Sequence, residues 1–321
     1  MATTAEGIRR KRGFPVGTLD LEYEWLEGEW ERLFDAQIAL VQSDLRRARA
    51  EDRLVVYLSC PIGARGGGYH GTNVDVARFI ERRLLAQWGE GVWILNPVNY
   101  QMQSKGGTGY MHRHAKALGI DLDALLARTG PPNGGDYMRM WTRVLAENGE
   151  IVGRRALPSG LVNTGQYFDA FYFIGPSDVH GMFRTQGGTL TEGIHEYFTR
   201  KAMHDLDFCD AFSIRGLDFG RSPTAFAEQE SKERDRWQIL RSDFFRYYAL
   251  RASANYSLGS HDEWLILQKL NALRRQHWTP FEGREVGGIG DQIAAFFDGA
   301  QVDIAASERP NVARSTKLSG S

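Results

Sequence analysis

Residues 186–193, Gln-Gly-Gly-Thr-Leu-Thr-Glu-Gly, place a glycine turn and a carboxylate at the expected start of a helix. The segment comes after an apolar run at 170–174, which we expect to be a strand. Glycine has no Cβ, so Gly188 would let a ligand approach the backbone closely. The free N–H groups beside Thr189 would face an anion or a sugar. With Glu192 in the first helical turn, the segment suits an enzyme that acts at the anomeric carbon of a nucleoside.

The same segment also has a purely structural interpretation. Thr189-x-x-Glu192 fits a capping box, in which each side chain accepts a hydrogen bond from the other residue's backbone N–H. Helices without any chemistry often begin in this way. From this segment alone, the cap and the catalytic carboxylate both stay open.

A second candidate site is the loop after the first expected strand. Leu54–Leu58 is a continuous apolar run, as in a strand that is buried on both faces. The loop leaves its carboxyl end, where open α/β sheets bind ligands. Glycine N–H groups and an arginine there would surround a phosphate, and the candidate residues are Ser59, Arg65, Gly66, Gly67 and Gly68. The loop is neither a Walker A loop nor a dinucleotide fingerprint, and an unliganded surface loop is the alternative.

The elements around these segments predict a Rossmann-like α/β fold, a parallel sheet flanked by helices. A helix beginning near Asn73 separates the first strand from a second apolar strand at 92–95. Such βαβ units imply a right-handed parallel sheet. Ala170–Ile174 would be a central strand, and His180, near its carboxyl end, would touch the substrate.

The rest of the chain is expected to be mainly helical. The spacing of apolar residues predicts a helical N-terminal arm over about 19–49, and Ser222-Pro223 starts a long helix that ends near 251. Ser260-x-x-Glu263 is a second capping box, opening a helix through 273. Shorter elements are expected as helices at 121–128, 137–147 and 291–297 and as a strand at 208–214. The expected units are a disordered start (1–18) and arm within 1–52, a core over 53–215, a helical extension over 216–304 and a disordered tail over 305–321.

Several short motifs recur in one order along the core. They are Tyr57-Leu58-Ser59-x-Pro61, a helix, a strand ending in Asn-Pro, Asp169-Ala170 opening a strand, and Gly188-Thr189-x-x-Glu192-Gly193. Over roughly 53–215 this order resembles the nucleoside 2-deoxyribosyltransferase superfamily, which includes nucleotide N-glycosidases. The resemblance implies a double displacement, in which a glutamate attacks the anomeric carbon and the base leaves. Part of the motif is also similar to lysine-decarboxylase-like phosphoribohydrolases.

The resemblance implies a role for three side chains. Glu192 would be the nucleophile, the hydroxyl of Tyr57 would orient it, and Asp136 would hold the base or donate a proton. The structural alternatives are a buried strand tyrosine at 57 and a helix N-cap at 136. Gln186 stands where many family members have an aspartate, so leaving-group protonation must come from another group. The resemblance also implies a homodimer or larger homo-oligomer.

Composition limits the partners. The chain has 321 residues with 39 basic and 40 acidic side chains, so no global field attracts nucleic acid or an anionic membrane. Its two cysteines give neither a disulfide framework nor a zinc spacing. We expect no metal or cofactor. No run of 18 apolar residues is present, and we expect a cytoplasmic protein.

The sequence therefore predicts hydrolysis, or less favourably transfer, at the N-glycosidic bond of a nucleoside or nucleoside 5'-monophosphate. The phosphate-sized loop after the first strand favours the nucleotide. Two alternatives stay open. One is a non-catalytic nucleotide-binding module that uses Glu192 only as a cap, and the other is an NAD-cleaving glycohydrolase.

Overall fold

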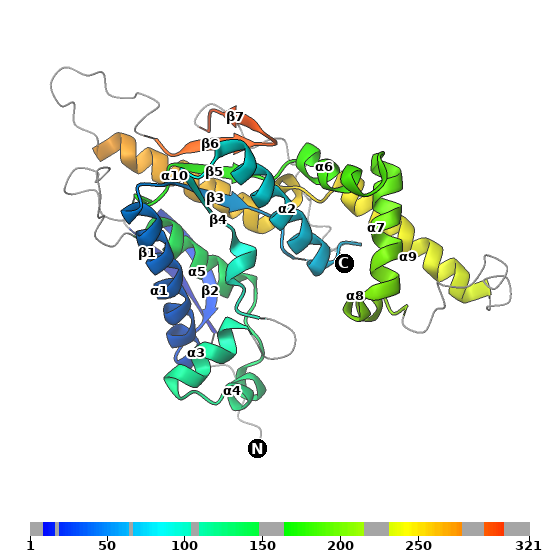
Figure 1. The fold of residues 1–321 in the computed structure, drawn as a ribbon. Coiled ribbons are helices and arrows are strands. Elements are labelled where there is room, and N and C mark those ends of the chain that lie inside the picture. Colours follow the sequence, from blue (N-terminus) through cyan, green and yellow to red (C-terminus); the bar gives the residue numbers. More distant parts are fainter. Residues whose placement is uncertain are drawn as a thin grey trace, which may run out of the picture.

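A computed structural model describes residues 9–16, 19–63, 67–103, 109–147, 164–214, 231–277 and 292–304. Its centre is a five-stranded sheet with the order β4-β3-β5-β6-β7 (Figure 1). The strands are β3 (Leu54–Ser59), β4 (Val92–Leu95), β5 (Ala170–Phe173), β6 (Ala294–Phe297) and β7 (Ala300–Val302). The first four are parallel and β7 returns antiparallel to β6. The expected Rossmann-like α/β fold is confirmed.

Strand β3 is buried on both faces, which explains its uninterrupted apolar sequence. Successive side chains of a strand point to opposite faces. Val55 and Tyr57 accordingly enter one core cluster, and Val56 and Leu58 enter the other. Ser59 therefore shares the face of Tyr57, which decides where its hydroxyl can reach.

Helices cover both faces of this sheet (Figure 1). The core on the Tyr57 side is built with α1 (Glu29–Ala50), α3 (Tyr110–Leu118), α4 (Leu122–Thr129), α5 (Gly134–Ala146) and α10 (Leu258–His277). The opposite core is built with α2 (His70–Trp88), α6 (Pro176–Gly187), α7 (Leu190–His204), α8 (Leu206–Ala211) and α9 (Ser231–Leu250). The structure also has two short 3-10 helices, η1 (Pro97–Tyr100) and η4 (Ala254–Tyr256).

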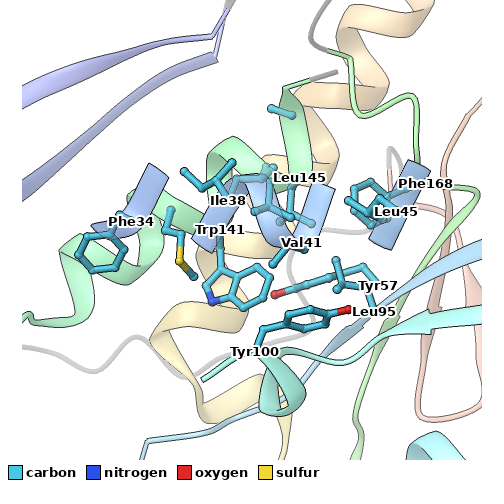
Figure 2. Close-up of a cluster of buried hydrophobic side chains, with 14 of the residues drawn as sticks. Phe34, Ile38, Val41, Leu45, Tyr57, Leu95, Tyr100, Trp141, Leu145 and Phe168 are labelled. Atoms are coloured by element: carbon cyan, nitrogen blue, oxygen red, sulfur yellow. The ribbon is translucent and has the colours of Figure 1, made fainter. Parts of the chain in front are cut away.

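Figure 2 shows the first of these cores, where Tyr57 of β3 lies among apolar side chains of α1 and α5. The rings of Tyr57 and Trp141 have centroids 6.1 Å apart. Ile38, Val41 and Leu45 recur every three or four residues along α1 and supply its buried face. The core thus encloses the ring of Tyr57 and fixes the direction of its hydroxyl.

The N-terminal segment differs from the expectation. Residues 9–16 form β1 (Arg9–Val16), which pairs antiparallel with β2 (Leu19–Leu26), so the disorder expected there and the helix expected from 19 are both wrong. Apolar and acidic residues alternate with a period of two in 19–25, which is the period of a strand. The helix begins only after Gly28, whose φ is 72°. Strand β2 packs on α5.

Two further assignments were wrong. Residues 206–211 form helix α8, capped by the Asp205 carboxylate, and not the strand expected at 208–214. Residues 294–297 form strand β6, and not a helix, because this short apolar run pairs with β5. The segment expected to be a helical extension packed on the core therefore supplies β6 and β7 to the main sheet, and α9 and α10 to its two layers.

The helices expected at 121–128 and 137–147 are confirmed as α4 and α5, and the one expected through 273 is α10. The helix start expected at Ser222-Pro223 and the disordered tail expected from 305 lie outside the described residues. Within the described part of the chain, no helix is long and apolar enough to cross a bilayer.

Candidate functional site

Glu192 lies in the first turn of α7, in the capping box. Its backbone N–H donates to the Thr189 hydroxyl at 3.2 Å, and its Oε2 accepts from the Thr189 N–H at 3.2 Å and from the Thr189 hydroxyl at 2.9 Å. The residue is exposed. The structural interpretation of Thr189-x-x-Glu192 therefore accounts for both side chains.

The glycines of the same segment serve helix packing. Gly188 has φ 75° and ends α6, a conformation that L side chains rarely adopt. A Cβ on Gly187 would lie 2.6 Å from the backbone nitrogen of Gly193, and a Cβ on Gly193 would overlap the carbonyl of Phe183. The backbones of α6 and α7 are thus in direct contact. Close approach of two helices explains these glycines without a ligand.

Glu192 and Tyr57 are not brought together. The whole of α6 separates β5 from α7, and its 12 residues span about 18 Å. Moreover, α7 packs in the core on one face of the sheet, whereas Tyr57 lies in the core on the other face. The expectation that Tyr57 orients Glu192 is therefore wrong.

Tyr57 instead orients Glu263 of α10. The Tyr57 hydroxyl donates to Oε1 of Glu263 at 2.6 Å, and the Ser59 hydroxyl donates to Oε2. Both donors are fully buried, and Glu263 is 6% exposed. Because residues 57 and 59 share one face of β3, the two hydroxyls reach the two oxygens of one carboxylate. Two residues predicted for the site thus meet, at a glutamate that the sequence-based prediction assigned to a cap.

Helix α10 brings Glu263 to the carboxyl end of β3. Ala254 lies four residues before α10, and its backbone N–H donates to the carbonyl of Ile174 at 2.8 Å. Ile174 directly follows β5. The ring of Trp264 then packs on Phe173 of β5, with centroids 4.7 Å apart. From this end the helix runs back along the sheet, and Arg274 near its far end bonds to the carbonyls of 164 and 165, which precede β5.

The capping box expected at Ser260-x-x-Glu263 is wrong. The helix begins at Leu258, and the Ser257 hydroxyl accepts from the Ser260 N–H at 3.3 Å. This start places Glu263 in the second turn, on the buried face together with Leu267 and Leu270. A carboxylate inside an apolar stripe is costly to bury without a partner. That stripe is the signal in the sequence that could have identified Glu263.

The environment shifts the proton affinity of this cluster. Burial raises the pKa of Glu263 to about 7, against the lowering effect of the hydrogen bonds from Ser59 and Tyr57. Burial, and then the nearby Glu263, raise the pKa of Tyr57 well above its usual value, so the hydroxyl stays protonated and keeps donating. A carboxyl group with a pKa near neutrality can take up or release a proton at the pH of most cells.

Asp136 holds the N-terminal hairpin in place. It occupies the third position of α5 in a capping box whose N-cap is Asn133, so the expected N-cap assignment is wrong by three residues. Its carboxylate accepts from the Asn133 N–H at 2.7 Å and from the Leu26 N–H at 2.5 Å. These bonds tie β2 to the start of α5 and account for the burial of this aspartate.

Three other predicted site residues, His180, Gly67 and Gly68, lie against α9. His180 Nε2 lies 2.9 Å from the carbonyl oxygen of Ala249. Gly67, with φ 99°, packs so closely on α9 that a Cβ would lie 2.5 Å from the Asp243 carbonyl oxygen. A Cβ on Gly68 would lie 2.6 Å from the Tyr247 ring. These glycines therefore face a helix, while Arg65 and Gly66 lie outside the described residues.

Within the described ranges, no group of three or more histidine, cysteine, aspartate or glutamate side chains could hold a metal ion. Cys60 and Cys209 are both buried, and neither is in a disulfide bond. Comparisons of this chain with family models, with curated proteins and with solved structures found no match.

Proposed function

We propose that this chain cleaves the N-glycosidic bond of a nucleoside or nucleoside 5'-monophosphate, with hydrolysis favoured over transfer, and that Glu263 is its nucleophilic carboxylate. The observation that carries the proposal is the pair of hydroxyl donors, Tyr57 and Ser59, on the two oxygens of Glu263. In the superfamily that the sequence resembles, the tyrosine of the first strand orients the catalytic glutamate. Here the same tyrosine orients Glu263.

The place of Glu263 in the fold supports this role. In open α/β sheets, ligands bind outside the carboxyl ends of the strands. Glu263 of α10 lies beside the carboxyl end of β3, because it bonds to Ser59, the last residue of that strand.

The proposed reaction uses Glu263 in its ionised form. One carboxylate oxygen attacks C1' of the sugar, a C–O bond forms, and the electron pair of the C1'–N bond leaves with the base. Water then attacks C1' and releases the carboxylate. Tyr57 and Ser59 favour the ionised form because both donate to it. The base must be protonated by another donor, since Glu263 cannot be nucleophile and acid in one step.

A second function is a nucleotide-binding module without catalysis. It is favoured by the role of Glu192 as an exposed cap and by the low exposure, 6%, of Glu263. An NAD-cleaving glycohydrolase would break the same type of bond and would release nicotinamide. One substrate panel separates the three functions, because only the two enzymes release a free base.

We further infer that the protein acts in the cytoplasm as a homodimer or larger assembly. The two buried thiols, which form no disulfide, fit a reducing compartment. The assembly follows only from the superfamily that the sequence resembles, and mass measured by light scattering tests it.

The test incubates purified protein with nucleosides, nucleoside 5'-monophosphates and NAD, and measures released base by chromatography. Glu263→Gln keeps the shape of the side chain and removes the charge, so we expect release to fall by about 10²–10⁴-fold. Glu192→Gln is the matched control at the Thr189-x-x-Glu192 segment and should keep wild-type release. Circular dichroism verifies that both variants are folded. Undiminished release by Glu263→Gln would contradict the proposal, and nucleotide binding without release would establish the module.

A further inference from the structure

A histidine on α7 and an arginine on α9 are joined by a hydrogen bond that requires an uncharged ring. Arg241 Nε lies 3.0 Å from Nδ1 of His195. Guanidinium nitrogens are donors only, so Nδ1 must keep its lone pair and the ring proton must sit on Nε2. The ring also stacks on Phe245 of α9, with centroids 5.4 Å apart.

The charges around His195 oppose its protonation. Burial and the nearby Arg241 lower its pKa below the usual value. On its own helix, Glu196 is exposed and Glu192 is bonded to Thr189. From α6, Arg184 is exposed. A proton on Nδ1 would replace the acceptor by a second donor and place a cation against the guanidinium.

Helix α9 also contacts the segment that follows β3. The Tyr248 hydroxyl accepts from the Tyr69 N–H at 3.0 Å and lies 2.9 Å from Oδ1 of Asn73. Asn73 in turn donates to the carbonyls of 62 and 63, in the loop that follows Ser59. Arg241 and Tyr248 are seven residues apart, two helical turns, and thus lie on the same side of α9.

A second histidine forms a hydrogen bond to α9 that protonation of its ring does not break. His180 Nε2 bonds to the carbonyl oxygen of Ala249 at 2.9 Å. A carbonyl only accepts, so this nitrogen donates, and it still donates when the ring is protonated. Helix α9 therefore has two hydrogen bonds to histidines. Protonation breaks the one between Arg241 and His195, and it preserves the one between Ala249 and His180.

The geometry points to an acid-sensitive latch: protonation of His195 breaks its bond to Arg241, frees that part of α9 from α7 and loosens residues 67–73, while His180 keeps the end of α9 in place. The latch is independent of any activity at Glu263. It controls the mobility of residues 67–73.

Hydrogen–deuterium exchange at pH 7.5 and 5.5, corrected for the intrinsic pH dependence of exchange, tests the latch. In the wild type we expect peptides from 237–250 and 67–73 to exchange about tenfold faster at pH 5.5, the change expected when a hydrogen bond to a charged group is lost. His195→Gln retains an acceptor for Arg241 without a titratable group, so its exchange should not accelerate. His180→Gln is the matched control and should respond to acid as the wild type does.

Two further variants keep the test decisive if His195→Gln does not fold. His195→Lys carries a permanent charge and should exchange at pH 7.5 as fast as the wild type at pH 5.5. Arg241→Gln removes the opposing cation and should lose the acid response. The latch is overturned if the wild type shows no acceleration in these peptides, or if His195→Gln or Arg241→Gln accelerates as the wild type does.

Discussion

Tyr57 and Glu263 are separated by 206 residues in the chain, and the hydroxyl of the first donates to Oε1 of the second at 2.6 Å. Two Ser/Thr-x-x-Glu segments of the chain differ in the structure from what the sequence predicts. Thr189-x-x-Glu192, expected to carry the chemistry, is a helix cap, and Ser260-x-x-Glu263, expected to be a cap, carries the buried carboxylate.

Removing the Tyr57 hydroxyl should destabilise the ionised form of Glu263. Tyr57→Phe leaves Oε1 of a buried carboxylate without this donor, which costs about 1–3 kcal/mol. Because this bond lowers the pKa of Glu263, its loss should raise that pKa further. Urea unfolding should therefore show a larger loss of stability at pH 8 than at pH 5.

Tyr100→Phe is the matched control for that substitution, since the Tyr100 hydroxyl donates to a different carboxylate, Asp44, at 2.8 Å. A Tyr57→Phe effect equal at both pH values, or no larger than that of Tyr100→Phe at pH 8, would contradict the assigned bond.

Stability should fall as the pH rises through the titration of Glu263. The folded-state pKa of about 7 exceeds the ordinary 4.5, so between these values the folded chain binds more protons than the unfolded chain. The contribution is fully present below pH 4.5 and is lost as the pH passes 7. At about 1.36 kcal/mol per pKa unit, the loss amounts to roughly 3 kcal/mol.

Glu263→Gln should remove this dependence, so the free energy of unfolding of the variant minus that of the wild type should increase from pH 5 to pH 8. Urea titrations at several pH values measure the difference. A difference that stays constant with pH would show that Glu263 does not titrate in this range.

Thr189 should contribute to stability as a cap. Thr189→Ala removes the side-chain acceptor of the Glu192 N–H and should cost about 1 kcal/mol of unfolding free energy. Thr189→Ser keeps the hydroxyl and should restore most of it. Under the proposed function, neither substitution should lower the rate of base release. A loss of release with unchanged stability would indicate that Thr189-x-x-Glu192, and not Glu263, carries the catalytic carboxylate.

Gly193 should be required for the packing of α7 on α6. The Cβ of Gly193→Ala would overlap the backbone carbonyl of Phe183, which cannot rotate away, so the helices must separate. Overpacking of this kind costs about 1–3 kcal/mol. Gly181→Ala, at a glycine of α6 whose Cβ meets open space, is the control. Thermal unfolding in which the two variants match would contradict the close contact.

Local patterns predicted much of the sheet and part of the site. The apolar runs at 54–58, 92–95 and 170–174 are strands because both of their faces are buried. Tyr57 and Ser59 were predicted at the site, and both reach Glu263. These predictions depend only on runs of neighbouring apolar residues and on the position of Tyr57 and Ser59 in β3, and both can be recognised in the sequence.

The misassigned elements depend on contacts between distant segments. Residues 294–297 are too few for their period to distinguish strand from helix, and only pairing with β5 makes them a strand. Gly187 and Gly193 fit a ligand turn as well as a helix contact, and only the position of α6 decides. The partner of Tyr57 follows from the packing of α10 on the sheet, which no local motif encodes.

The most direct test of the central claim is to identify the residue that bonds to the sugar. Protein turning over its best nucleoside or nucleotide substrate is quenched in acid, digested and mapped by peptide mass spectrometry. The account predicts a pentosyl or phosphopentosyl adduct on the peptide that contains Glu263, and none on the peptide that contains Glu192. An adduct on Glu192, or turnover without any adduct at Glu263, would contradict it.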